Sequence, residues 1–222
     1  EELTRVLSAK VGLIDIFFCQ DEKAVSNISH LKKISYCTRY NTMLDSLRLV
    51  EKLHPTTKHT EINEKFAIVS LHRFETISRK ENLEMVVTEI KKIADKIKLF
   101  FILHPPTRVS LKKNGLYDNL EENPSCTLLP RQSFFEFNNL LSKTEFLITD
   151  GGSNQEECFY LGTPCLLFRS ETERSEGIGE NIVVSNFDPT IIENFVLNYN
   201  SYRRQPIPVV FSPSRFIVDQ LV

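Results

Sequence analysis

Short, continuous apolar runs alternate with stretches of helical periodicity through the middle of the chain. Buried strands are predicted at residues 66–71, 99–103, 126–129, 145–149 and 164–168. After the first of these, apolar residues recur at helical spacing on one face from Leu83 to Ile97, and shorter helices are predicted at 134–141 and 155–161. Strands that are apolar throughout and alternate with helices are typical of a parallel sheet covered on both faces. The predicted fold class is therefore α/β and Rossmann-like.

The N-terminal part of the chain shows the same alternation in a weaker form. A helix is predicted at residues 3–13, a strand at 14–19 and a polar helix at 21–33. Either Asn41 or Thr42 is a suitable cap for another helix, which ends at Leu53 because Pro55 follows. Residues 55–63 are polar and unpatterned, so a loop is expected there.

In open parallel sheets, ligands bind beyond the carboxyl ends of the strands. This rule selects the residues that directly follow the predicted strands, which are His72-Arg73, His104, residues 150–153, and Arg169 onward. The functional residues are therefore sought among these four positions.

Composition and charge narrow the classes of protein. The 222 residues carry 27 Lys and Arg against 29 Asp and Glu, without a basic block, so nucleic-acid binding is not expected. The longest apolar run is far shorter than a membrane helix requires, and no signal peptide is recognisable. The chain lacks an initiating Met, which suggests a fragment or a processed chain. Its five cysteines form no CxxC pair, so we expect buried thiols in the cytoplasm and no metal site.

Gly151 and Gly152 stand between a predicted strand and a predicted helix. Backbone without Cβ atoms can approach a ligand closely, and free N–H groups at a helix start bind phosphate oxygens. A tight strand-to-helix turn explains the pair equally well, and both explanations stay open at this point. Glu156 and Glu157 are placed in the first turn of the helix, where they would favour the helix dipole.

The other strand-end residues also have a simpler explanation. The charged segment from Arg169 to Gly177 could be a solvated loop, although it follows a buried strand directly. His72 and His104, each taken alone, are more often structural than functional. Their place at two adjacent strand ends favours a functional pair.

Five segments together resemble the C-terminal half of the UDP-N-acetylglucosamine 2-epimerases. They are Ser70-Leu71-His72-Arg73-Phe74-Glu75, His104-Pro105, the run from Thr149 to Glu157, Leu161-Gly162-Thr163-Pro164, and Arg169 with the run from Thr172 to Glu176. Their order and spacing match the family over residues 65–185. The combination is specific, whereas each motif alone would be weak.

The chain departs from the family pattern at three places. The family usually reads Asp-Ser-Gly-Gly-Ile-Gln-Glu-Glu where this chain has Asp150-Gly151-Gly152-Ser153-Asn154-Gln155-Glu156-Glu157. Ser175 replaces a proline, and the usual Gly-Asn-Thr appears as Tyr40-Asn41-Thr42. The permuted small residues keep a backbone that could hold phosphate.

The resemblance implies a glycosyltransferase-B-like architecture of two Rossmann-like domains with the nucleotide sugar between them. Residues 1–41 would then be a remnant of the N-terminal domain. Residues 42–222 would form the C-terminal UDP-binding domain with its C-terminal helices. The implied reaction inverts C2 by anti-elimination of UDP and re-addition, and a hydrolysing branch of the family adds water instead.

The resemblance also implies roles for individual residues. His72 would be catalytic, facing the diphosphate near the reacting bond. Gly151, Gly152 and Ser153 would hold the phosphates and Glu157 the ribose hydroxyls. Arg73 and His104 match cleft positions that, in some members, touch a second, regulatory UDP-sugar. Phe134 or Phe137 would flank the uracil, unless both pack in the core. The remaining cleft-lining positions are Arg169, Glu173 and Arg174.

The family is expected to need no cofactor and to work in the cytoplasm, as a homodimer when full-length, in cell-surface polysaccharide biosynthesis. The isolated chain is expected to be inactive, because the family's catalytic carboxylates belong to the first domain. Two alternatives stay open. One is a UDP-sugar transferase of the same architecture, and the other is a non-catalytic UDP-sugar-binding module.

Overall fold

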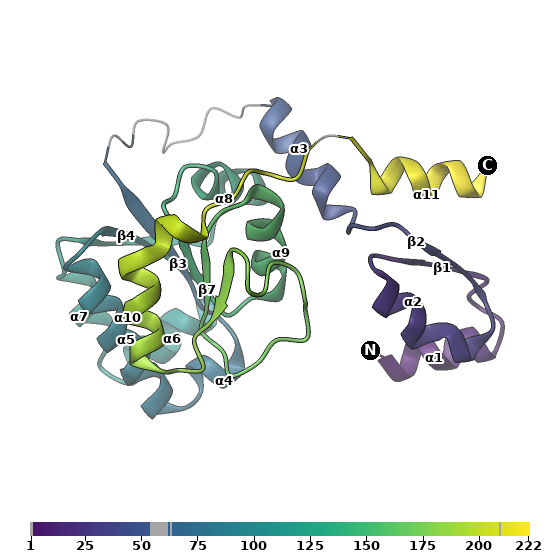
Figure 1. Ribbon diagram of the computed structural model, residues 1–222. Coiled ribbons are helices and arrows are strands. Elements are labelled where there is room, and N and C mark those ends of the chain that lie inside the picture. Colours follow the sequence, from purple (N-terminus) through teal and green to yellow (C-terminus); the bar gives the residue numbers. More distant parts are fainter. Residues whose placement is uncertain (1, 54–61, 63, 209) are drawn as a thin grey trace. The chain divides into compact units, whose positions relative to one another are not determined.

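The computed structural model describes residues 2–53, 62, 64–208 and 210–222. The chain divides into two compact units, one made of residues 1–49 with 208–222 and one made of residues 50–207 (Figure 1). The sequence placed the boundary near residue 41 and assigned all C-terminal residues to the second unit. The predicted loop at 55–63 lies outside the described residues, except for Ile62.

The larger unit is built on a sheet of six parallel strands in the described residues. The strands are β3 (Phe66–Ser70), β4 (Lys98–Leu103), β5 (Cys126–Pro130), β6 (Leu147–Thr149), β7 (Cys165–Leu167) and β8 (Ile182–Val184). Their order across the sheet is β5-β4-β3-β6-β7-β8. The chain therefore moves outward from β3 to β5, returns to the other side of β3, and continues to β8. The reversal between β3 and β6 is a topological switch point, where α/β sheets bind ligands.

Helices cover both faces of this sheet. They are α4 (Phe74–Ile77), α5 (Lys80–Ala94), α6 (Pro105–Lys113), α7 (Tyr117–Glu121), α8 (Phe134–Leu141), α9 (Gly152–Leu161) and α10 (Pro189–Asn198), followed by the 3₁₀ turn η2 (Tyr199–Tyr202). Ala67 and Val69 of β3 face a core that α5, α7 and α10 cover, whereas Phe66 and Ile68 face a core under α8 and α9. Alternate residues of the buried strand thus pack into the cores on the two faces of the sheet. The predicted α/β fold class is confirmed.

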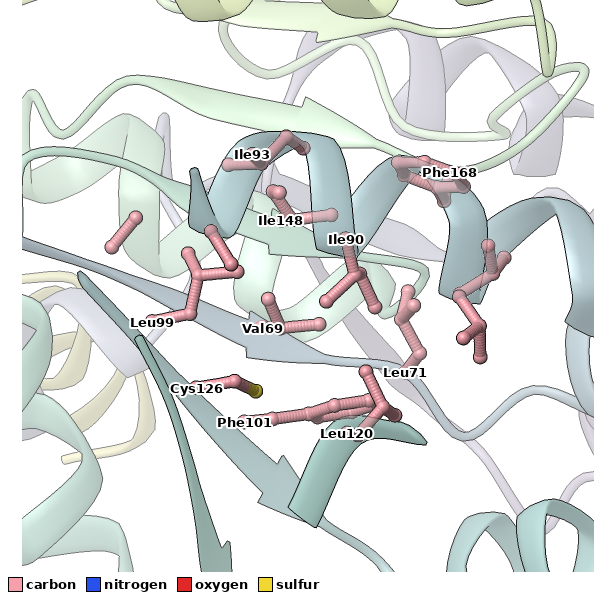
Figure 2. Close-up of a cluster of buried hydrophobic side chains, with 14 of the residues drawn as sticks. Val69, Leu71, Ile90, Ile93, Leu99, Phe101, Leu120, Cys126, Ile148 and Phe168 are labelled. Carbon is pink, nitrogen blue, oxygen red and sulfur yellow. The ribbon is translucent and has the colours of Figure 1, made fainter. Parts of the chain in front are cut away.

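The first of these cores shows how helical spacing is used. Ile90 and Ile93 project from α5 toward Val69 and Ile148, which belong to the two strands at the switch point (Figure 2). All four side chains are almost completely buried. Their packing holds β3 and β6 in place, so the residues just beyond these two strands are held on a rigid support.

The smaller unit contains the parallel pair β1 (Ile16–Cys19) and β2 (Ile34–Cys37), with α1 (Glu2–Lys10), α2 (Glu22–Ile28), η1 (Ser29–Leu31) and α11 (Pro213–Leu221). The helix α3 (Met43–Leu53) begins in this unit. Asp45 on α3 accepts hydrogen bonds from the Ser212 hydroxyl and the Ser214 N–H at 3.0 and 2.8 Å. These bonds explain why the C-terminal helix belongs to the smaller unit.

Most predicted elements are present, with ends shifted by a few residues. Asn41 caps α3 as expected, since its side-chain oxygen accepts the Met43 N–H at 3.0 Å. The prediction missed β2 and β8, which are short, and α4 and α7, whereas α10 and α11 (Pro213–Leu221) are C-terminal helices of the kind expected. It also missed α6, which begins at Pro105 directly after a strand, as proline is well tolerated in the first turn of a helix. In the described part of the chain, every helix is too short or too polar to cross a lipid bilayer.

Candidate functional site at the switch point of the sheet

Asp150 joins the ends of the two strands at the switch point. It follows β6 and is completely buried. Its carboxylate accepts the His72 N–H at 3.0 and 3.1 Å and the Arg73 N–H at 2.9 Å, and both donors follow β3. The Nδ1 atom of His72 lies 3.5 Å from the same carboxylate. A buried carboxylate with such donors is satisfied, so it stabilises the backbone on which His72 is mounted.

His72 and His104 lie together, as their adjacent strand ends predicted. The two rings stack with centroids 4.4 Å apart and an interplanar angle of 25°. Burial lowers the pKa of His104, and the neighbouring His72 and Arg131 lower it further. His104 Nε2 lies 3.4 Å from the Ser70 hydroxyl. The pair therefore forms one face of the site, with His104 favouring its neutral form.

The N-terminus of α9 supplies a second face. Gly151 is the N-cap, and the first backbone bond of the helix runs from the Gln155 N–H to the Gly151 carbonyl at 3.1 Å. The N–H groups of residues 152–154 thus have no acceptor within the helix. A Cβ atom on Gly151 would lie 2.9 Å from Asn154 Oδ1 and 3.3 Å from His72 Cε1. The glycine pair therefore forms a tight turn and also leaves helix-start donors beside His72.

The predicted position of the two glutamates is wrong. Helix α9 starts at Gly152, three residues earlier than predicted, because the first turn of a helix tolerates glycine. Glu156 and Glu157 lie in the second turn and are buried, so they do not complement the helix dipole as first-turn residues would. Burial raises the pKa of Glu157 to about 7, although Asn154 donates to its carboxylate at 2.7 Å.

Arg174 crosses the start of α9. Its guanidinium pairs with the buried carboxylate of Glu156. It also occupies the space above Gly152, where a Cβ atom would lie 2.6 Å from Arg174 Nε. The position of Arg174 therefore requires a glycine at residue 152, in addition to the requirement of any ligand that binds at this point.

The charged segment after β7 is tied to α9 and is not simply solvated. Gln155, completely buried, donates to the carbonyls of Arg174 and Glu176 at 3.2 and 2.9 Å, and accepts the Thr172 hydroxyl at 2.8 Å. Glu173 is exposed and contacts both Arg169 (3.0 Å) and Arg73 (3.5 Å). Its own backbone N–H and these two guanidinium groups lower the pKa of Glu173. The segment thus brings three further charged groups to the edge where His72 lies.

The two phenylalanine candidates differ in their surroundings. Phe137 is buried in the core under α8 with Phe66 and Phe100, as the packing explanation expected. Phe134, at the start of the same helix, is 40% exposed, and its ring centroid lies 5.9 Å from that of Phe135. Of the two, Phe134 is the one whose ring is accessible to a ligand.

Two residues of this site, Asp150 and Gln155, were not assigned a role from the sequence, and Glu156 was assigned only an interaction with the helix dipole. All three are completely buried. The available signal was a run of polar residues that directly follows a strand. Among the described residues, no group of three or more His, Cys, Asp or Glu could hold a metal ion.

Comparison with known proteins shows the family of the chain. A family model described as UDP-N-acetylglucosamine 2-epimerase matches residues 1–205. The chain is 29% identical to a UDP-N-acetylglucosamine 2-epimerase of Methanocaldococcus jannaschii, over 94% of this chain and 60% of that protein. The chain thus spans about three fifths of the length of this relative.

Solved structures are similar to the whole chain. The structure of the UDP-GlcNAc 2-epimerase from M. jannaschii superposes with a TM-score of 0.82 at 25% identity, covering 100% of this chain and 65% of that one. The enzyme from Neisseria meningitidis bound to UDP-GlcNAc superposes with a TM-score of 0.78 at 26% identity, covering 100% and 64%. Together with the match over residues 1–205, these likenesses show that the chain belongs to the UDP-N-acetylglucosamine 2-epimerase family.

Proposed function

We propose that the protein containing this chain interconverts UDP-N-acetylglucosamine and UDP-N-acetylmannosamine, and that residues 50–207 are its UDP-binding half. One observation carries the proposal. His72 and the free N–H groups at the start of α9 meet at the switch point of a parallel sheet, and Asp150 connects the two. An anion-binding helix start beside a histidine is suited to a departing diphosphate.

The reaction requires a base at C2 and groups that stabilise the departing diphosphate. A base removes the proton from C2 while the bond between C1 and the diphosphate oxygen breaks, which gives 2-acetamidoglucal and UDP. UDP then adds again to C1, and C2 takes a proton on its other face. In this chain, the N–H groups of Gly152 and Ser153 bind the diphosphate, and His72 stabilises the charge that develops on it as it departs.

The remaining predicted residues recognise the nucleotide and frame the cleft. Glu157 accepts the ribose hydroxyls, and the exposed ring of Phe134 stacks on the uracil. Arg169 and Arg174 add positive charge to the cleft edge that Glu173 shares. Arg73 and His104 form a position at which a second UDP-sugar could bind as a regulator. The smaller unit, residues 1–49 with 208–222, belongs to the other domain of the enzyme.

We infer that the base at C2 comes from outside the 222 residues. The carboxylates that the described chain brings to this edge are engaged with other groups. Asp150 accepts backbone N–H groups, Glu156 pairs with Arg174, Glu173 contacts two arginines, and Glu157 accepts from Asn154. The 222-residue chain should then bind UDP weakly and leave C2 of the sugar untouched.

Proton NMR in deuterated water tests both parts. The chain is incubated with UDP-N-acetylglucosamine, and exchange at C2 is followed against a sample without protein. No exchange, together with UDP binding by calorimetry, is the expected result. Exchange above the control would show that the base lies within these residues.

A protein that contains both domains gives the second arm of this test. Conversion to UDP-N-acetylmannosamine, or release of N-acetylmannosamine by a hydrolysing enzyme, supports the proposal. Transfer of the sugar to an added acceptor without change at C2 would contradict it. We further propose that the enzyme works in the cytoplasm as a homodimer and supplies cell-surface polysaccharide biosynthesis. Family resemblance supports these points, and sedimentation of the full-length protein tests the dimer.

A further inference from the structure

One of the two ring nitrogens of His72 faces the Asp150 carboxylate. Its Nδ1 atom is buried, makes no hydrogen bond in the described structure, and lies 3.5 Å from Asp150 Oδ1. The carboxylate that faces it is completely buried. A bare nitrogen lone pair against a buried carboxylate would be repulsive, whereas an N–H there is attracted to it. The proton of neutral His72 therefore belongs on Nδ1.

The ring of His72 lies beside the start of α9. His72 Cε1, the carbon between the two nitrogens, is 3.3 Å from the position of a Cβ on Gly151. Both ring nitrogens are bonded to this carbon, so the edge of the imidazole that carries them lies beside the glycine turn. About two fifths of the side chain is exposed, although Nδ1 is buried. The exposed part of the ring thus includes the side away from Asp150.

We propose that Asp150 is the positioning residue for His72. Its carboxylate sets the backbone at His72 and Arg73 through their N–H groups, and it holds the proton on Nδ1 in both protonation states of the ring. Nε2 is then the nitrogen that gains and loses a proton, facing the site where the diphosphate departs. The carboxylate acts through the position of the His72 ring and does not touch the substrate. This inference rests on the proposed function for the role of His72, but the placement of the proton does not.

The residues around Asp150 and His72 are consistent with a proton held on Nδ1 of His72. Stacking against His104 fixes the plane of the ring, and burial keeps His104 itself toward its neutral form, since its pKa is lowered. Thr149 Oγ1 accepts the Gly151 N–H at 3.0 Å, which leaves the Asp150 carboxylate to the His72 and Arg73 donors. The Asp150 carboxylate thus faces the His72 imidazole, and this imidazole lies beside the start of α9.

The first test reads the tautomer directly in the chain as it exists. Nitrogen-15 NMR of the histidine rings, at a pH where His72 is neutral, should show at least about four fifths Nδ1–H at this residue. A His72→Gln variant assigns the signal, and exposed His30 serves as an internal reference. An Nε2–H majority at His72 would overturn the proposal, and this measurement needs no variant of Asp150 to fold.

The second test removes the charge. Asp150→Asn keeps the size of the side chain but offers one acceptor oxygen to several donors, so the His72 signal should shift to a mixture of tautomers. The matched control is Asp95→Asn, an exposed change after α5, which should leave the tautomer as in the wild-type chain. An unchanged Nδ1–H majority in folded Asp150→Asn would contradict the role of the carboxylate.

Turnover by the protein with both domains separates this inference from the proposed function. Asp150→Asn should lower kcat by about 10- to 100-fold with KM within about threefold, as expected for a group that orients another. If the tautomer is as expected but His72→Ala turns over normally, the proposed role of His72 fails while the positioning by Asp150 stands. If kcat of Asp150→Asn equals that of the wild type, the positioning role in the reaction is wrong.

Discussion

Gly152 lies directly beneath Arg174, and a Cβ atom on this glycine would be 2.6 Å from Arg174 Nε and 3.1 Å from its Cδ. The same arginine pairs with buried Glu156 one turn further along α9. The absence of a side chain at Gly152 therefore allows Arg174 to lie over the start of α9. The need for glycine at position 152 thus follows from the position of a charged side chain.

Gly152→Ala should weaken UDP binding by about 10- to 100-fold, because the added methyl group displaces Arg174 from the diphosphate site. One charge-assisted contact of this kind contributes about 1.5–3 kcal/mol. Gly152→Val, which is larger, should abolish binding. Calorimetric titration with UDP measures both. In an Arg174→Ala background, Gly152→Ala should have little further effect, and an undiminished effect there would mean that the methyl group blocks the phosphate itself.

His72→Ala should lower kcat of the protein with both domains by about 10²-fold or more, the usual scale for a positioned acid or charge stabiliser. The ring has a buried face against Asp150 and a stacked face against His104, so a thermal melt must accompany the assay. A variant with normal turnover and a lower melting temperature would show that His72 has only a structural role.

Glu157 should make stability depend on pH. Its folded-state pKa is raised to about 7 from an ordinary value of 4.5, mainly by burial. The folded chain then binds the extra proton between these values, so the contribution of this carboxyl to the free energy of unfolding is greatest below pH 4.5. It falls as the pH rises through 7, by about 3 kcal/mol in all.

Urea unfolding of the wild type and of Glu157→Gln at pH 5 and pH 8 checks this prediction. The wild type should lose more stability than the variant between the two values, since a glutamine does not ionise. Glu122→Gln, an exposed change elsewhere in the same unit, should follow the wild type. Equal pH dependence in wild type and Glu157→Gln would show that this carboxyl is ionised throughout.

Gln155→Leu should loosen the segment after β7. The leucine keeps the volume of the buried side chain but removes its bonds to Thr172 and to the carbonyls of Arg174 and Glu176. Leaving such groups unpaired costs about 1–3 kcal/mol. Hydrogen exchange in residues 172–177 should become faster, and UDP binding weaker. Gln132→Leu, which removes a single bond to the Pro130 carbonyl, should leave that exchange unchanged.

The local pattern of apolar and polar positions was sufficient to predict the α/β fold class. The apolar runs that became β3 and β4 are buried along their full length or nearly so, and the periodic face of α5 is the face that packs on them. Both signals are local, because burial on two faces requires an unbroken apolar strand, and burial on one face requires helical spacing. Resemblance over several strand ends then indicated the family that the comparisons show.

Local pattern failed where an element depends on its surroundings. The start of α9 was placed too late because glycine is a poor helix former, yet it opens this helix where Arg174 needs space. Phe134 and Phe137 are three residues apart on one short helix, and the sequence could not separate the accessible ring from the buried one. Only the position of α8 on the sheet decides that difference.

A strand and the polar residue that follows it are adjacent along the chain, so the residues at the carboxyl ends of the buried strands could be predicted from the sequence. Which of these strand ends are neighbours became visible only in the folded chain. Asp150 and His72 are 78 positions apart, and they meet because β6 pairs with β3 on the side away from β4. Strand order depends on how entire helices pack on the two faces of the sheet, so no local run of residues encodes it. The histidine was visible in the sequence, and the carboxylate that orients it was visible only in the fold.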